Sequence, residues 1–113
     1  MELHKKKCIP CEKKNIKPFD HDTAHVYARE IPSWTLAENG KSISKKYAFA
    51  DFGASLRFVN TVGDIAEMEG HHPDITINYN KVALSLSTHS IGGLTENDFI
   101  VAAKIDALEK FPH

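Results

Sequence analysis

The segment of residues 52–69, FGASLRFVNTVGDIAEME, constrains the fold more than any other part of the chain. Its apolar residues recur every three or four positions, so in a helix they form one broad stripe. The stripe contains Phe52, Leu56, Val59, Gly63 and Ala66, with Phe58, Val62 and Ile65 beside it. A stripe of this width can cover a β-sheet. We therefore expect a helix here, with Asp51 as N-cap and Gly70 and Pro73 marking its end.

Two pairs of short segments predict the strands of a sheet. Residues 34–37 and 42–50 flank an Asn-Gly pair, which supplies the positive backbone angles of a tight turn. Residues 75–79 and 82–87 alternate between apolar and polar side chains on either side of a turn near Asn80. We therefore expect one β-hairpin before the long helix and a second one after it.

Shorter helices are expected at both ends of this pattern. Residues 21–31 predict a helix that stops before Pro32, because proline disfavours a helical residue before it. Thr95 with Asp98 three residues later resembles a capping box. The apolar positions of the helix that follows are Phe99, Ala102, Ala103, Ile105 and Leu108.

The order helix, two strands, helix, two strands, helix predicts an α+β protein. The expected architecture has two layers: a four-stranded antiparallel sheet and helices on one of its faces. An open edge strand of such a sheet is a template for another chain, so we expect two copies to pair edge to edge.

The length of 113 residues suits one domain. Residues 1–19 are rich in lysine and lack periodicity, so we expect a loosely ordered arm before a single domain over 20–113. A formal net charge of -1 is unlike the basic footprint of a nucleic-acid binder. No apolar run approaches the roughly 20 residues that span a bilayer, which favours a cytoplasmic protein.

The only two cysteines, Cys8 and Cys11, form one CxxC motif. The motif suits a redox pair, half a zinc site or two reduced thiols. His4, His21 and His25 have spacings that match no standard zinc finger, so plain thiols are favoured.

Three histidines are expected to meet at one end of the sheet. His71 and His72 follow the end of the long helix, where the helix dipole favours a protonated imidazole, and Glu67 on the last turn could reinforce this effect. His89 ends the second strand of a hairpin whose first strand begins just after His72, so the hairpin returns it to the pair.

Such a cluster suits proton transfer or metal binding, because histidine titrates at about pH 6.5. A single histidine at a strand end is more often a hydrogen-bonded surface residue, but three that converge make that reading weaker. Adjacent His71 and His72 rarely bind one ion, because their side chains diverge in extended backbone. Asp98 has a simpler role as the capping acid, and Trp34 and Tyr79 suit packing.

The run Glu67-x-x-x-His71-His72-Pro73, with Tyr79, His89 and Asp98 at fixed distances after it, resembles the signature of the pterin-4a-carbinolamine dehydratases. The segment YNKVALSLSTHSIGGLTENDF is similar to that family's hairpin, strand end, glycine loop and closing helix. The resemblance covers roughly residues 20 to 111. It departs at Gly70 and Ser90, where some relatives carry acidic residues.

This resemblance implies dehydration of 4a-hydroxytetrahydropterins to quinonoid dihydropterins, which recycles the pterin of aromatic amino acid hydroxylases. It implies no metal or organic cofactor, and a homodimer that in some members pairs again into a tetramer. The implied catalytic residues are His71, His72, His89 and Glu67, and the implied substrate-binding residues are His71, His72, Pro73, Ser87, Thr88, His89 and Asp98. Our hypothesis makes His72 or His89 the acid and His71 the base, with Glu67 tuning His71.

Two alternatives belong to other functional classes. A non-catalytic, coactivator-like interaction module of the same fold would keep its function without the histidines. A metal-dependent hydrolase using the three histidines would contain stoichiometric zinc and lose activity with a chelator.

Overall fold

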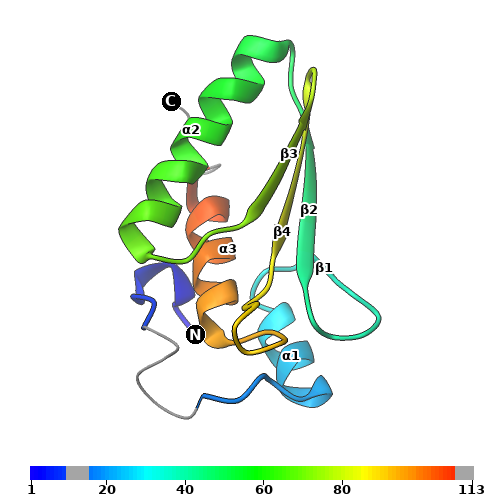
Figure 1. Ribbon diagram of the computed structural model, residues 1–113, viewed down its shortest axis with the longest axis vertical. Helices are drawn as coiled ribbons and strands as arrows, with labels where there is room; N and C mark the ends of the chain where they lie inside the picture. The colour runs from blue at the N-terminus through cyan, green and yellow to red at the C-terminus, as the bar shows by residue number, and fades with distance from the viewer. Residues whose placement is uncertain (10–15, 109–113) are drawn as a thin grey trace.

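The computed structural model describes residues 1–9 and 16–108, and it has the expected α+β architecture (Figure 1). Its elements are η1 (Leu3–Lys5), α1 (His21–Ala28), β1 (Thr35–Leu36), β2 (Ile43–Ala48), α2 (Phe52–Glu69), β3 (Asp74–Asn78), β4 (Lys81–Leu86) and α3 (Glu96–Leu108). Figure 1 shows α2 and α3 on one side of the sheet, as predicted, and α1 near its lower end. Within the described ranges, every helix is too short or too polar to cross a bilayer.

The sheet joins the two predicted hairpins through their second strands. The strand order is β1-β2-β4-β3, and every neighbouring pair is antiparallel. In the second hairpin Asn78 pairs with Lys81 and Asp74 pairs with Ser85. The strand that leads towards His89 therefore begins beside the end of β3 and finishes beside its start, close to the end of α2.

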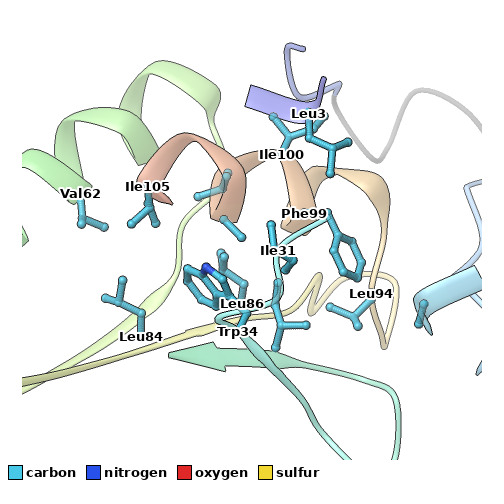
Figure 2. Close-up of a cluster of buried hydrophobic side chains, with 14 of the residues drawn as sticks. Leu3, Ile31, Trp34, Val62, Leu84, Leu86, Leu94, Phe99, Ile100 and Ile105 are labelled. Carbon is cyan, nitrogen blue, oxygen red and sulfur yellow. The ribbon is translucent and has the colours of Figure 1, made fainter. Parts of the chain in front are cut away.

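The core lies between the sheet and α3. Alternate side chains of β4 point inwards, and α3 contributes buried residues over several consecutive positions (Figure 2). Its largest members include Ile31, Ile43, Leu84, Leu86, Leu94, Phe99, Ile100 and Ile105. We expected α3 to be amphipathic, but six consecutive residues, 97–102, are buried and so cover every side of the helix. Something other than the sheet must cover its outer face.

The first nine residues provide that cover, which corrects the expectation of a loose arm in this part of the chain. Leu3 is only 2% exposed and joins the core (Figure 2). Lys6 Nζ lies 3.0 Å from Glu96 Oε2, and Lys104 Nζ donates to the carbonyl of His4 at 3.1 Å. The lysine-rich composition suggested a loosely ordered segment, but Leu3 is buried in the core and residues 1–6 form specific ion pairs. Cys11 lies outside the described residues.

The predicted ends of α2 are confirmed. Asp51 caps the helix by accepting the Ala54 N–H at 2.8 Å, and Gly70 ends it with φ of 65°. The second hairpin differs by one residue, because β3 stops at Asn78 and Tyr79 lies in the turn with φ of 56°. The Tyr79 ring is therefore exposed instead of packing in a strand.

Candidate active site

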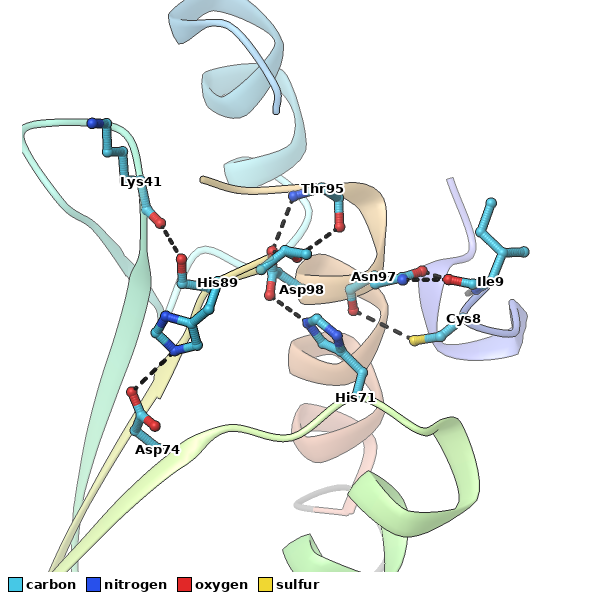
Figure 3. Close-up of polar contacts among 11 residues, drawn as sticks. Cys8, Ile9, Lys41, His71, Asp74, His89, Thr95, Asn97 and Asp98 are labelled. Atoms are coloured by element: carbon cyan, nitrogen blue, oxygen red, sulfur yellow. Dashed lines mark hydrogen bonds and ion pairs between the residues drawn. The ribbon is translucent and has the colours of Figure 1, made fainter. Parts of the chain in front are cut away.

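His71 is held by a buried carboxylate. The left-handed turn at Gly70 ends α2 and places His71 beside the start of α3. There its Nε2 lies 2.6 Å from Asp98 Oδ1 (Figure 3). The His71 side chain is 12% exposed and that of Asp98 is fully buried. One edge of the imidazole is thus fixed against a carboxylate while part of the ring still reaches solvent.

The second oxygen of Asp98 completes a small polar network. It accepts the Thr88 hydroxyl at 2.8 Å and the Thr95 backbone N–H at 3.0 Å. The bond from Thr95 confirms the expected capping role of Asp98. Since the single hydroxyl proton of Thr88 goes to the carboxylate, the Thr95 hydroxyl donates to Thr88 Oγ1, 2.9 Å away. A buried carboxylate needs such partners, and Asp98 has them on both oxygens.

The other two histidines form open ion pairs. His72 Nε2 lies 3.6 Å from Glu67 Oε1, and His89 Nε2 lies 3.6 Å from Asp74 Oδ2. All four side chains are more than half exposed. We expected Glu67 to orient His71, and the structure corrects this: Glu67 pairs with His72, and Asp98 takes the place beside His71.

Asp74 is a site residue that the sequence analysis missed. It is the first residue of β3, and it pairs in register with Ser85 of β4. The hairpin that returns His89 towards His71 therefore also brings it to Asp74, so the register contained a signal for this contact.

The three histidines open onto one hollow of about 410 Å³. Ser87 and Thr88, two of the residues predicted to bind substrate, also line it. Three other predicted site residues lie outside its lining, namely Glu67, Pro73 and Asp98. Asp98 is fully buried and contacts the His71 ring, so it can influence the hollow only through that imidazole.

Two further lining residues, Cys8 and Ile9, come from the N-terminal segment and were not anticipated. Cys8 N–H donates to Glu69 Oε1 at 2.9 Å. Burial, followed by the negative charge of Glu69, raises the pKa of the Cys8 thiol to about 12. Burial opposes ionisation of Glu69, but the Cys8 N–H and the charge of Lys104 outweigh it and hold the pKa of Glu69 below its usual value. Cys8 is thus a neutral thiol at neutral pH.

Groups of His, Cys, Asp and Glu with a metal-binding arrangement are absent from residues 1–9 and 16–108. Each imidazole instead faces its own carboxylate, and such pairs suit the transfer of protons.

The fold and the site together define a small α+β protein with a histidine cluster at the end of a helix and a hairpin. Residues 17–108 match the model of the family described as pterin 4 alpha carbinolamine dehydratase, and the chain belongs to that family. A protein of Azoarcus sp. (strain BH72), whose name places it in the same family, is 43% identical over 107 residues, which cover 95% of this chain and 91% of that one. A match of this coverage includes part of residues 1–19.

Two solved structures are also similar. The "transcriptional coactivator/pterin dehydratase" from Brucella melitensis has a TM-score of 0.75 at 28% identity, covering 81% of this chain and 98% of that one. A pterin dehydratase-like protein identified as a RuBisCO assembly factor in the alpha-carboxysome has a TM-score of 0.57 at 25% identity, covering 67% of this chain and 88% of that one. The fold is therefore shared by proteins with different described roles.

Proposed function

We propose that this protein dehydrates 4a-hydroxytetrahydropterins to quinonoid dihydropterins by histidine acid–base catalysis. The observation that carries the proposal is the hollow of about 410 Å³ onto which His71, His72 and His89 all open. Membership of the family supplies the substrate class. The product would return to the pterin pool used by an aromatic amino acid hydroxylase.

The reaction needs one proton donor and one proton acceptor. The C4a–O bond breaks, and the departing hydroxyl takes a proton from an imidazolium and leaves as water. The N5 lone pair forms the C4a=N5 double bond at the same time. The cationic pterin then loses a ring N–H proton to a base. General acid–base catalysis contributes about 10² to 10⁴-fold for each such transfer.

The environments of the histidines support a division of roles. His71 is fixed by Asp98 and is the base in this proposal, because the buried carboxylate next to it can stabilise the imidazolium that forms. His72 and His89 are exposed and paired with Glu67 and Asp74, so either can take a proton from water and deliver it to the hydroxyl. Pro73, Ser87 and Thr88 are proposed to shape the pterin site with them.

The test is to generate a 4a-hydroxytetrahydropterin in situ with an aromatic amino acid hydroxylase and to follow its dehydration spectroscopically. We expect the wild type to accelerate the reaction and His72→Ala and His89→Ala each to lose at least about tenfold in kcat/KM. His25→Ala is the control, because His25 is an exposed histidine of α1 whose ring contacts His21 and its carbonyl. A wild-type rate equal to the spontaneous rate would refute the proposal.

A second candidate is an interaction protein of the same fold. The word coactivator in the description of the Brucella structure points to it, and so do the apolar side chains of Phe52 and Leu56 on α2, which are 45% and 40% exposed. This function would survive His72→Ala and His89→Ala. A variant with Phe52→Ser and Leu56→Ser would instead lose binding of the partner protein or of a second copy of the chain.

A further inference from the structure

The N-terminal segment lines the same hollow as the histidines, at its other end. Cys8 and Ile9 contribute to the lining, and in Figure 3 they lie on the opposite side of His71 from His89. Ile9 is 55% exposed although its side chain is large and apolar. This part of the hollow therefore presents one apolar side chain, Ile9, beside the polar groups of Glu69 and Asn97, while the histidine part offers proton transfer.

The backbone at Ile9 is held on both its polar groups by one side chain. Asn97 Oδ1 accepts the Ile9 N–H at 3.0 Å, and Asn97 Nδ2 donates to the Ile9 carbonyl at 2.7 Å (Figure 3). Asn97 is only 4% exposed. Cys8 adds two contacts, from its N–H to Glu69 and from its Sγ to the Asn97 carbonyl at 3.6 Å. Residues 8 and 9 are therefore locked to the end of α2 and the start of α3.

Two consecutive residues of α3 thus hold two separate parts of the hollow's lining. Asn97 holds Ile9, and Asp98 holds His71. We call the two hydrogen bonds between Asn97 and the Ile9 backbone the clamp. The clamp is not needed merely to anchor the N-terminal residues, because buried Leu3 and the Lys6–Glu96 ion pair already hold residues 1–6 on α3. Asn97 instead sets the position of Cys8 and Ile9, which face the hollow among the described N-terminal residues.

We propose that Ile9 is a specificity-determining residue that packs against the end of the pterin remote from the reacting carbon, and that Asn97 is its positioning residue. The inference rests on the proposed dehydratase function and names a contact within that site. The chemistry is apolar contact with the ring substituent of the substrate. Cys8, as a neutral thiol, lies beside this contact without introducing a charge.

Ile9→Ala tests the contact. Two substrates are compared, one with a methyl group and one with a longer side chain on the pterin ring. We expect Ile9→Ala to raise KM for the substrate with the longer side chain about three- to tenfold, with kcat within twofold. The rise in KM for the methyl substrate should be smaller. Val26→Ala is the matched control, because Val26 is an exposed apolar residue of α1 that does not line the hollow. Equal KM values for Ile9→Ala and wild type on both substrates would overturn the inference.

Asn97→Ala and Asn97→Asp test the positioning role. Alanine removes both hydrogen bonds to Ile9, and aspartate turns a carboxylate oxygen towards the Ile9 carbonyl in place of the donor, so both should raise KM, with kcat within twofold. A loss of kcat with unchanged KM would show that Asn97 acts through Asp98 and His71 instead. Rates are measured well below each variant's Tm, so that unfolding does not contribute.

Calorimetric titration with an oxidised, unreactive pterin separates failure of this inference from failure of the proposed function. If the wild type binds the pterin but does not accelerate dehydration, the proposed function fails, and the ratio of Kd values for Ile9→Ala and Val26→Ala still decides the role of Ile9. Equal Kd values would overturn the role of Ile9 alone. If the wild type binds no pterin, both proposals fail.

Discussion

Asp98 links the helix start to the histidine site at the scale of single residues. One of its oxygens accepts from Thr88 and Thr95 and the other faces His71. A carboxylate is suited to this position, because it can accept from all its neighbours at once and can stabilise either a neutral Nε2–H imidazole or an imidazolium. An amide in this position could accept from Thr88 and Thr95 with its oxygen, but its NH₂ group could not accept a proton from His71 Nε2.

Asp98→Asn should therefore separate stability from activity. Its oxygen can still serve Thr88 and Thr95, but its NH₂ would face His71 Nε2 and force the neutral Nδ1–H form of the ring. We expect a loss of about 1–2 kcal/mol in the free energy of unfolding and a fall of about 10²-fold or more in kcat. Urea unfolding and the dehydration assay measure the two effects.

Asp22→Asn is the control for Asp98→Asn, because Asp22 is a fully exposed acid on α1. It should change the free energy of unfolding by less than about 0.5 kcal/mol. If Asp98→Asn behaved like this control in both assays, the buried network would have no role in the site.

The sequence predicted which histidines meet but not which carboxylate each one faces. Hairpin topology brings His89 back to His71 and His72 whatever their rotamers, so the cluster follows from strand order. Whether His71 pairs with Glu67 or with Asp98 depends on the direction that the turn at Gly70 gives to the His71 side chain and on the burial of Asp98. Both are properties of packing that spacing along the chain does not contain.

At the scale of elements, two glycines of α2 should respond oppositely to alanine. Gly70 ends the helix with φ of 65°, and Gly63 lies inside it; neither position has an atom within 4 Å of an added Cβ. Backbone conformation alone therefore decides the effect. We expect Gly70→Ala to cost about 1 kcal/mol and Gly63→Ala to gain about 0.5–1 kcal/mol, because glycine is a poor residue inside a helix.

Thermal unfolding of both variants measures this difference, and Gly63→Ala serves as the control for a change of composition in the same helix. Gly70→Ala should also lower dehydratase activity, because it shifts the turn that places His71. Stabilisation by Gly70→Ala would contradict the assigned helix end.

The elements that were predicted best are those with local signals. The apolar stripe with a cap at each end defined α2 with the bounds that the structure has. The turn at Tyr79 was placed one residue too late, because a tyrosine with φ of 56° is rare and alternation alone continues through it. The burial of α3 on all sides was missed, because its outer cover comes from residues about 90 positions away in the sequence, as the pair Lys6–Glu96 shows.

At the scale of the whole molecule, the partly buried thiol of Cys8 shows whether residues 1–9 are in place. The pKa of Cys8 is about 12 in the folded protein against 9.0 for an ordinary thiol. At pH 8.5 we expect alkylation of Cys8 to be many-fold slower in the native protein than in urea, as read by peptide mapping with mass spectrometry. Asn97→Ala should speed the native reaction, because it releases the clamp. Equal rates in native protein and urea would mean that the fold does not shield Cys8.

The same pKa difference predicts a dependence of stability on alkali. Below pH 9 the thiol is protonated in both the folded and the unfolded chain, so its contribution is complete. Between pH 9 and about 12 only the unfolded chain ionises, so the folded state loses this contribution as pH rises. As pH rises over this range, the Tm of the wild type should fall relative to the Tm of Cys8→Ser. A Tm difference that stays constant would contradict the assigned pKa of Cys8.

The clamp on Ile9 also has a consequence for the order in which the protein is made. The contacts between Ile9 and Asn97 join residues 88 positions apart, and those between Cys8 and Glu69 join residues 61 apart. A ribosome adding about 5–20 residues per second releases the first partner several seconds before the last one. The part of the hollow formed by Cys8 and Ile9 is therefore fixed only after the start of α3 has emerged. A shorter nascent chain already contains His71 and His72 but lacks the complete site. A ligand that needs the complete hollow therefore cannot bind before Asn97 has emerged and reached Ile9.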